Sequence, residues 1–255
     1  MNYLNYLNYL KRIGFEGEAK ADLATLSNLQ YRHFLSVPYE NLDILRNVPL
    51  SLETTDLYDK IVVRKRGGYC FELNALFDWL LCEIGFKTKN YFARFLLDEP
   101  KIPMRRHRVI LVEIEDEIYL SDVGVGSVTP ELPLRLVKNE ETTIRGLTYM
   151  FEKDEFLGWV LNVKRGEKWS QLYSFTADAQ LEVDFVQPNF YCQYSPDSVF
   201  KKANMVSLRT ETGKYTLDAN TFRELELFGA AIKTERECTE DEIPGILKQY
   251  FGIEL

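Results

Sequence analysis

The chain has 255 residues, 45% of them apolar and 27% charged, so it predicts a folded globular protein of one or two domains with a substantial core. The net charge of −8 argues against a general nucleic-acid-binding protein, which would carry a basic face. No apolar run approaches the roughly 20 residues of a transmembrane helix, so we expect no membrane partner.

The N-terminal third carries mainly helical patterns. A triplet repeated over residues 2–10 predicts the first helix, and a second helix is expected from residue 25. Residues 38–45 are predicted to be extended, and residues 55–64 helical. From Phe71 to Ile84, apolar residues recur at helical spacing, and Gly85 is well placed to end that helix.

The remainder carries mainly strand patterns, which favour a barrel or a sandwich. The expected strands are residues 91–97, 108–114, 117–123, 148–153, 158–163 and 169–175. A hairpin of residues 205–209 and 215–217 follows, with its turn at Thr212 and Gly213. Thr239 and Glu242 form a predicted capping box before a last helix, which Gly252 ends.

Residues 66–74, with the sequence RGGYCFELN, are the most informative segment. Gly67 and Gly68 can adopt backbone angles that other residues avoid, so the chain can turn sharply before the helix. Cys70 then lies at the helix N-terminus, where free N–H groups and the helix dipole favour a thiolate. We interpret Cys70 as a nucleophile; the alternative is a small buried apolar residue.

A cysteine nucleophile needs a base, and the chain has only two histidines. His33 shares a helical face with Leu26 and Leu29, which is typical of a hydrogen-bonded histidine at the edge of a core. His107 starts a β-branched strand, so it is the better candidate for the base.

A short hairpin around Glu115 and Asp116 would pair residues whose numbers sum to 231. His107 is then opposite Gly124, which leaves its ring unobstructed. Asp122 becomes a diagonal neighbour of His107 on the same face, about 7–8 Å away between backbone positions. Taken alone, Asp122 would be an ordinary carboxylate at the end of a strand. Together with Cys70 and His107, the spacing favours a group that orients the His107 ring.

The other cysteines predict no metal site. Cys82, Cys192 and Cys238 are widely spaced and have no clustered histidine. Because no signal peptide is recognisable, we expect free thiols and a cytoplasmic protein.

Several segments together resemble the arylamine N-acetyltransferase family. Residues 66–74 resemble its active-site signature, and residues 37–42 (VPYENL) its Pro-aromatic-Glu-Asn-Leu segment. Residues 107–112 (HRVILV) resemble its histidine-led strand, and residues 122–126 (DVGVG) its Asp-x-Gly-Phe-Gly turn. Residues 189–191 (NFY) and 195–200 (SPDSVF) also fit, so the resemblance spans most of the chain in the right order.

The resemblance implies an α+β fold in three parts. These are an N-terminal helical bundle, residues 1–88; a central antiparallel β-barrel, residues 89–194; and a C-terminal α/β lid, residues 195–255. It further implies a catalytic triad of Cys70, His107 and Asp122, arranged as in cysteine proteases and transglutaminases.

Supporting and binding roles also follow from the resemblance. Arg66 and Glu40 match a structural ion pair, and Asn74 a supporting amide. The residues assigned to the coenzyme are Met104, Arg105, Gly124 and Gly126, and those assigned to the acceptor are Val125, Phe71 and Tyr39. Apart from the resemblance, the cations Lys101, Arg105, Arg106 and Arg108 form the best local cluster for coenzyme phosphates, or else a solvated loop.

Two features depart from the family. Val125 replaces the usual phenylalanine near the acceptor pocket, which removes an aromatic contact face. The chain also lacks the longer C-terminal extension of many relatives, a region that helps to shape the coenzyme cleft.

The resulting prediction is a cysteine acyltransferase that moves the acetyl group of acetyl-CoA to an arylamine, hydrazine or hydroxylamine through an acetyl-enzyme, with ping-pong kinetics. No metal is expected to take part. An amide synthase or a thioester or amide hydrolase with the same triad is the alternative, and a non-catalytic ligand-binding module is the third possibility.

Overall fold

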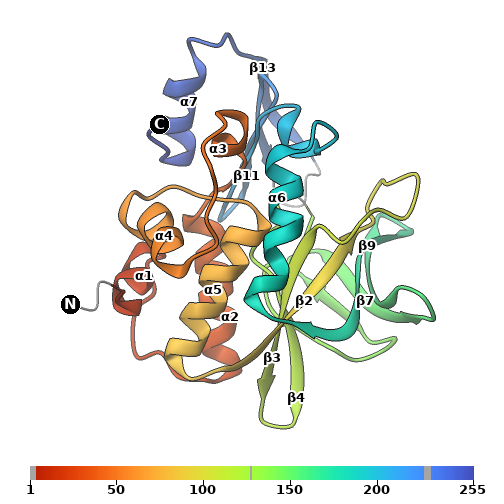
Figure 1. Ribbon diagram of the computed structural model, residues 1–255. Coiled ribbons are helices and arrows are strands. Elements are labelled where there is room, and N and C mark those ends of the chain that lie inside the picture. The colour runs from red at the N-terminus through yellow and green to blue at the C-terminus, as the bar shows by residue number, and fades with distance from the viewer. Residues whose placement is uncertain (1–3, 127, 227–230) are drawn as a thin grey trace.

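The computed structural model describes residues 4–126, 128–226 and 231–255 (Figure 1). Asn2 and Tyr3 of the triplet repeat lie outside these residues. The helices come first in the chain, an eight-stranded sheet follows, and a five-stranded sheet with the last helix completes an α+β fold. In Figure 1 the helices lie to the left, the eight-stranded sheet to the right and the C-terminal elements at the top.

The helical region packs around α5, which is Cys70–Ile84. Its neighbours are α1 (Tyr6–Arg12), α2 (Leu23–Ser36), α4 (Thr54–Tyr58) and the π-helical turn η1 (Asp59–Val63). Leu73, Leu76, Phe77 and Leu80 of α5 are fully buried in the shared core. Gly85 ends α5 at φ 107°, as the sequence predicted, because glycine adopts this left-handed geometry without strain.

His33 is a core residue. It is fully buried, its Nδ1 lies 3.0 Å from the Tyr9 hydroxyl, and its ring meets Phe77 edge-on. Burial, reinforced by Arg12, lowers the pKa of His33 to about 3, so the ring is neutral at physiological pH. This confirms the structural interpretation of His33, which lies inside the core rather than at its edge.

The segment predicted to be extended is only partly so. Tyr39–Glu40 forms β1, but Leu42–Leu45 forms the helical turn α3. The Glu40 carboxylate accepts the Leu42 N–H at 2.9 Å, which supplies a partner for the start of that turn. Leu42 and Ile44 are buried, so tertiary packing outweighs the local preference.

The eight-stranded sheet is antiparallel and curls into a nearly closed barrel, with the strand order β5-β4-β3-β2-β9-β8-β7-β6. Six strands were expected, and they are β2 (Lys87–Phe95), β3 (His107–Ile114), β4 (Glu117–Ser121), β7 (Leu147–Asp154), β8 (Gly158–Arg165) and β9 (Lys168–Gln180). The sequence missed the edge strands β5 (Leu134–Arg135) and β6 (Glu141–Ile144), which are too short to show periodicity.

The β3–β4 hairpin has the predicted register. Ile110 pairs with Ser121 and Leu111 with Leu120, so the paired numbers sum to 231. The turn is Glu115-Asp116, with Glu115 at φ 55°. Regular pairing stops at Ser121, so Asp122 directly follows the strand.

One helix was not predicted. The turn η2 (Glu182–Phe185) leads into α6 (Val186–Tyr194), which lies in front of α5 and the barrel in Figure 1. Pro188 obscured this helix in the sequence, yet it sits in the first turn, where its missing N–H has no helical partner to lose. The short turn η3 (Val199–Lys201) follows.

The second sheet has the order β1-β10-β11-β12-β13. The predicted hairpin is present as β10 (Met205–Thr210) and β11 (Gly213–Asp218). Its turn is at Glu211 and Thr212, one residue earlier than predicted, because Gly213 pairs with Thr210 as the first residue of β11. The sequence missed β12 (Thr221–Glu226) and β13 (Ile232–Glu237); the latter is exposed along its whole length and therefore shows no apolar alternation.

The last helix, α7 (Ile243–Phe251), ends at Gly252 as predicted. Glu242 accepts the Thr239 N–H at 2.8 Å, but this contact precedes the helix rather than opening it. None of the described helices combines the length and the apolar content needed to cross a membrane. The division into three domains stays a prediction, and β1 joins the N-terminal segment to the C-terminal sheet.

Candidate active site

Cys70 is the first residue of α5, as the sequence predicted. The Glu72 carboxylate accepts the Tyr69 N–H at 3.1 Å and so stabilises the helix start. The sequence predicted that Gly67 and Gly68 would adopt backbone angles that other residues avoid, but neither has a positive φ. A Cβ on Gly67 would instead lie 1.9 Å from the Pro38 carbonyl oxygen, so close packing requires glycine there.

Buried charges lie beneath the helix start. Arg66 donates to Glu40 at 2.7 and 2.9 Å, which confirms the predicted ion pair. Lys60 contacts Asp43 and Glu72, each at 2.8 Å. These groups hold the segment before α5 in place and leave no charge of the cluster without a partner.

His107 and Asp122 form a direct hydrogen bond. His107 Nε2 lies 2.7 Å from Asp122 Oδ2, and both side chains are almost fully buried. Burial alone would raise the pKa of Asp122, but the contacts of its carboxylate with His107, Asn74 and Gly124 outweigh that effect and lower the pKa. Asp122 is therefore an anion, and its hydrogen bond to Nε2 fixes the orientation of the His107 ring.

Asn74 links α5 to the hairpin. Its Nδ2 donates to Asp122 Oδ1 at 2.8 Å and to the Arg108 carbonyl at 2.6 Å. Its Oδ1 accepts the Val123 N–H at 2.9 Å. The side chain thus acts as the supporting amide that the resemblance implied.

Gly124 brings the hairpin against the cysteine. A Cβ built on it would lie 2.7 Å from Cys70 Cα and 2.6 Å from Asn74 Nδ2. The sequence placed Gly124 opposite His107 in a continued ladder, but the regular pairing ends earlier. The space that this glycine leaves open is occupied by Cys70 and Asn74.

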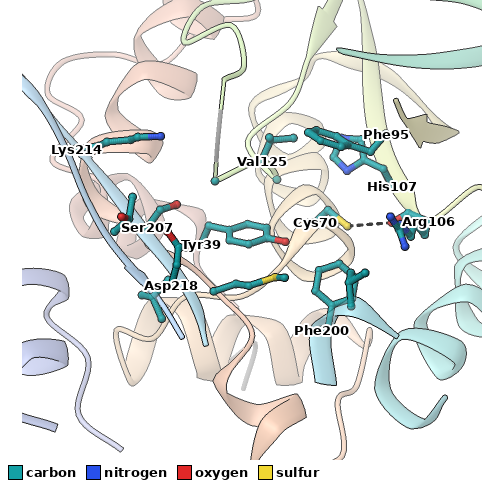
Figure 2. Close-up of a pocket in the computed structure, with 16 residues that line it drawn as sticks. Tyr39, Cys70, Phe95, Arg106, His107, Val125, Phe200, Ser207, Lys214 and Asp218 are labelled. Atoms are coloured by element: carbon teal, nitrogen blue, oxygen red, sulfur yellow. Dashed lines mark hydrogen bonds between the residues drawn. The ribbon is translucent and has the colours of Figure 1, made fainter. Parts of the chain in front are cut away.

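A cavity of about 370 Å³ opens at Cys70 (Figure 2). Its walls come from all three parts of the chain, and its lining residues are Tyr39, Cys70, Phe95, Arg106, His107, Gly124, Val125, Gly126, Val199, Phe200, Met205, Val206, Ser207, Lys214, Thr216 and Asp218. Cys70 Sγ contacts the Arg106 carbonyl oxygen at 3.6 Å. In Figure 2 the Tyr39 ring extends from the sheet side toward Cys70.

The predicted binding residues divide into two groups. Tyr39, Val125, Gly124 and Gly126 line the cavity. Phe71 does not, because it is fully buried against Tyr69 and Phe185 on the inner side of the helix. Met104 and Arg105 are likewise absent from the lining, and Met104 is exposed in the loop before β3.

The predicted cation cluster is not one surface. Arg108 is fully buried and binds Glu182 at 2.5 and 2.7 Å. It follows His107 on a strand, so its side chain projects to the opposite face and cannot reach the cavity. Arg106 lines the cavity while its guanidinium binds Glu99, and Lys101 is exposed.

Several lining residues had no signal in the sequence. Ser207, Lys214 and Thr216 are distant from Cys70 in the chain and belong to none of the recognised motifs. Tyr173 of β9 was also missed, although its ring packs against His107 with 5.4 Å between the centroids. Only the closure of the sheets around the cysteine brings these residues to the site.

Burial affects the Cys70 thiol more than the helix start does. Desolvation and the nearby Cys192 and Asp122 raise its pKa well above the ordinary value, and backbone N–H groups only partly oppose them. The helix N-terminus alone therefore does not produce the expected thiolate. His107, whose ring can accept a proton, lines the same cavity. Among the residues whose placement is described, no group of three or more His, Cys, Asp or Glu side chains could hold a metal ion.

Comparisons of the sequence with known proteins identify its relatives. Residues 22–255 match the family described as N-acetyltransferase. The chain is 32% identical to the arylamine N-acetyltransferase of Escherichia coli strain K12, over 95% of this chain and 86% of that protein. It is 33% identical to the arylamine N-acetyltransferase / N-hydroxyarylamine O-acetyltransferase of Salmonella typhimurium, over 89% of this chain and 81% of that protein.

Solved structures give the same result. The arylamine N-acetyltransferase of Mycobacterium abscessus superposes with a TM-score of 0.91 at 30% identity, covering 99% of this chain and 90% of that one. The Mycobacterium marinum enzyme, solved in complex with CoA, has a TM-score of 0.89 at 28% identity, covering 98% and 93%. From the match over residues 22–255 and these identities along most of its length, the chain belongs to the arylamine N-acetyltransferase family.

Proposed function

We propose that this protein transfers the acetyl group of acetyl-CoA to the nitrogen of an aromatic amine through an acetyl-enzyme on Cys70. The observation that carries the proposal is the hydrogen bond between His107 and Asp122 beside a cavity that His107 shares with Cys70. These three residues supply a nucleophile, a base and a carboxylate that orients the base. The same three roles make up the catalytic triads of cysteine proteases and transglutaminases.

In the first half-reaction, His107 Nδ1 takes the Cys70 proton and the sulfur attacks the thioester carbonyl of acetyl-CoA. The carbon–sulfur bond to the coenzyme then breaks. The coenzyme thiolate leaves with the proton that His107 held, and Cys70 carries the acetyl group. Asp122 stabilises the imidazolium that exists between these steps.

In the second half-reaction, the amine attacks the acetyl carbon and His107 accepts the proton that the nitrogen loses. The bond from carbon to Cys70 sulfur breaks, the amide leaves, and the thiol regains the proton. Backbone N–H groups at the start of α5, including that of Cys70, are placed to stabilise the oxyanion in both half-reactions.

The relatives support the choice of donor and acceptor. The Mycobacterium marinum structure contains CoA, and the names of the bacterial relatives specify arylamines and N-hydroxyarylamines. The cavity has space for a small aromatic ring, with Phe95 and Phe200 in its walls. Val125 occupies the position where the family usually has phenylalanine, so this chain presents a smaller aliphatic contact there.

Intact-protein mass after brief exposure to acetyl-CoA without acceptor tests the proposal. We expect one added acetyl group on the wild type and on the Cys82→Ser control, whose exposed thiol is removed, and none on Cys70→Ala. Adding an arylamine should discharge the acetyl-enzyme and yield the amide. Acetylation that persists in Cys70→Ala, or none in the folded wild type, would contradict the proposal. Loss of the adduct to water as fast as to amine would indicate a hydrolase.

A further inference from the structure

The five-stranded sheet contributes the apolar side chains of Met205 and Val206 to the cavity and, beside them, a group of polar side chains that forms a polar wall. The transfer chemistry proposed at Cys70 does not use this polar wall. Lys214, Thr216 and Asp218 alternate along β11 and all line the cavity. Ser207 of β10, the cross-strand neighbour of Thr216, lines it as well. Figure 2 shows Lys214 extending from this sheet toward the side of the cavity that holds Val125.

Thr216 presents a buried hydroxyl without a partner. Its side chain is only 6% exposed, and Oγ1 makes no hydrogen bond. Buried hydroxyl groups are normally paired, because an unpaired one loses the hydrogen bonds that water would give it. An oxygen atom of a ligand in the cavity would supply the missing partner.

Lys214 presents a cation without a counterion. No described residue makes a hydrogen bond or ion pair with its ammonium group, although Asp218 lines the same wall and contacts Arg223 at 3.6 Å. Its cross-strand neighbour Arg209 binds Glu131 at 2.7 Å. Burial and Arg209 lower the pKa of Lys214 to about 8, while Asp218 opposes them, so the group is still largely protonated at neutral pH.

The polar wall lies close to the nucleophile. A Cβ on Gly124 would touch Cys70, and a Cβ on Gly126 would lie 2.5 Å from Ser207 Oγ. The backbone between these two glycines can span at most about 7 Å. A compact acceptor can therefore span from Cys70 toward this wall, whereas the phosphates of the coenzyme are separated from the thioester by the whole pantetheine arm.

We propose, on the basis of the acetyl transfer proposed above, that Lys214 and Thr216 bind a carboxylate on the acceptor, so that the preferred acceptors are aromatic amines that carry a carboxylate. Lys214 supplies the charge and Thr216 donates a hydrogen bond to one carboxylate oxygen. The ring then lies between this wall and Cys70, with the amine directed toward the acetyl group. Both residues are specificity determinants and take no part in the bond changes.

The test compares 4-aminobenzoate with its methyl ester, which keeps the ring and the electron-withdrawing group but has no charge. Because hydrogen bonds to charged groups are strong, we expect the wild type to favour the acid by about tenfold or more in kcat/KM. Lys214→Met should abolish this preference and Lys214→Arg should keep most of it. The matched control is Lys233→Met on β13, an exposed lysine outside the cavity, which should behave like the wild type.

Thr216→Val keeps the shape of the side chain and removes the hydroxyl. Its effect should be a rise in KM for the acid of about threefold to tenfold, with little change for the ester. An acid-to-ester ratio that stays at the wild-type value in folded Lys214→Met and Thr216→Val, or a wild type without any preference for the acid, would overturn the proposal.

A donor experiment separates the two possible sources of anionic oxygen. The rate at which acetyl-CoA acetylates Cys70 should change less than about twofold in Lys214→Met. If that rate falls steeply while the acid-to-ester ratio is unchanged, Lys214 binds the coenzyme phosphates and the acceptor proposal is wrong. If Cys70 of the wild type is never acetylated, the proposed function itself fails, and this outcome is distinct from an acetyl-enzyme that reacts equally with both amines.

Discussion

At the scale of single residues, the proposed mechanism depends on a proton transfer between two buried groups, Cys70 and His107. Burial raises the pKa of the Cys70 thiol, so the neutral form is favoured as long as the sulfur has no cationic partner. Asp122 binds His107 Nε2 and so holds the ring in one orientation. In the proposed mechanism, the thiolate therefore forms when His107 takes the proton, and the helix start only assists it.

Replacing His107 by Gln should make the thiol slow to react. Without the base, Cys70 must ionise at its raised pKa, so alkylation by iodoacetamide at pH 7 should slow by at least about tenfold. The rate of the variant should keep rising with pH beyond the ordinary range of a free thiol, because the neutral form persists below the raised pKa. Site-resolved mass spectrometry measures both effects.

The measurement is best made in a Cys82→Ser background, since Cys82 is exposed and would react first. Equal reaction of both proteins after denaturation serves as the control. Wild-type alkylation rates in folded His107→Gln at pH 7 would show that the thiolate forms without this base.

At the scale of elements, the site is a contact between α5 and the end of the β3–β4 hairpin. Asn74 binds both Asp122 and the Arg108 carbonyl, and Gly124 lies against the Cys70 backbone. The hairpin carries the proposed base and the proposed carboxylate, and the helix carries the proposed nucleophile. Their relative position therefore depends on how closely these two elements approach each other.

Gly124→Ala should separate them. The new methyl group would lie 2.7 Å from Cys70 Cα, a backbone atom that cannot rotate away. Overpacking of this kind lowers the free energy of unfolding by about 1–3 kcal/mol. The displacement should slow acetylation of Cys70 by about 100-fold, because catalysis is sensitive to shifts of about 1 Å.

Gly245→Ala is the matched control, because nothing lies within 4 Å of a Cβ at that position in α7. Alanine is the better helix former, so we expect unchanged acetylation and a slightly higher melting temperature. Stopped-flow acetylation and thermal unfolding measure the two variants together. A wild-type acetylation rate in Gly124→Ala would show that the contact is not a constraint on the site.

At the scale of the whole molecule, buried charges connect segments that lie apart in the chain. Lys60 of η1 contacts Asp43 of α3 and Glu72 of α5, and Arg66 contacts Asp43 and Glu40. Burial opposes the charge on Lys60, but the carboxylates around it outweigh that effect and raise its pKa. The cluster joins the start of α5 to β1, and β1 in turn pairs with β10 of the second sheet.

Lys60→Met should be strongly destabilising. The substitution removes the cation that contacts the buried carboxylates of Glu72 and Asp43. Breaking such a buried ion pair lowers the free energy of unfolding by about 3–5 kcal/mol. The control is Lys20→Met, whose ion pair with Glu18 is exposed, and we expect no measurable change there. Urea unfolding at pH 7 provides the comparison. Similar stabilities for the two variants would mean that the cluster is not important for the fold.

Local information in the sequence was enough to predict the helix that starts at Cys70, the register of the β3–β4 hairpin and the proximity of His107 to Asp122. Each depends on residues a few positions apart, where helical spacing and strand pairing act directly. The sequence did not reveal α6, whose Pro188 resembles a helix breaker, or that Arg108 is buried on the face opposite the cavity and that Phe71 is buried.

The sequence by itself thus determined the local elements that carry the proposed reacting groups, because these groups lie within two local elements and carry recognisable motifs. Only the tertiary structure decided what surrounds them. Lys214 and Thr216 reach the cavity because β11 follows β10, which pairs with β1, and this order places the sheet across from Cys70. Contacts between residues so far apart in the chain depend on the packing of whole elements, which no local pattern encodes.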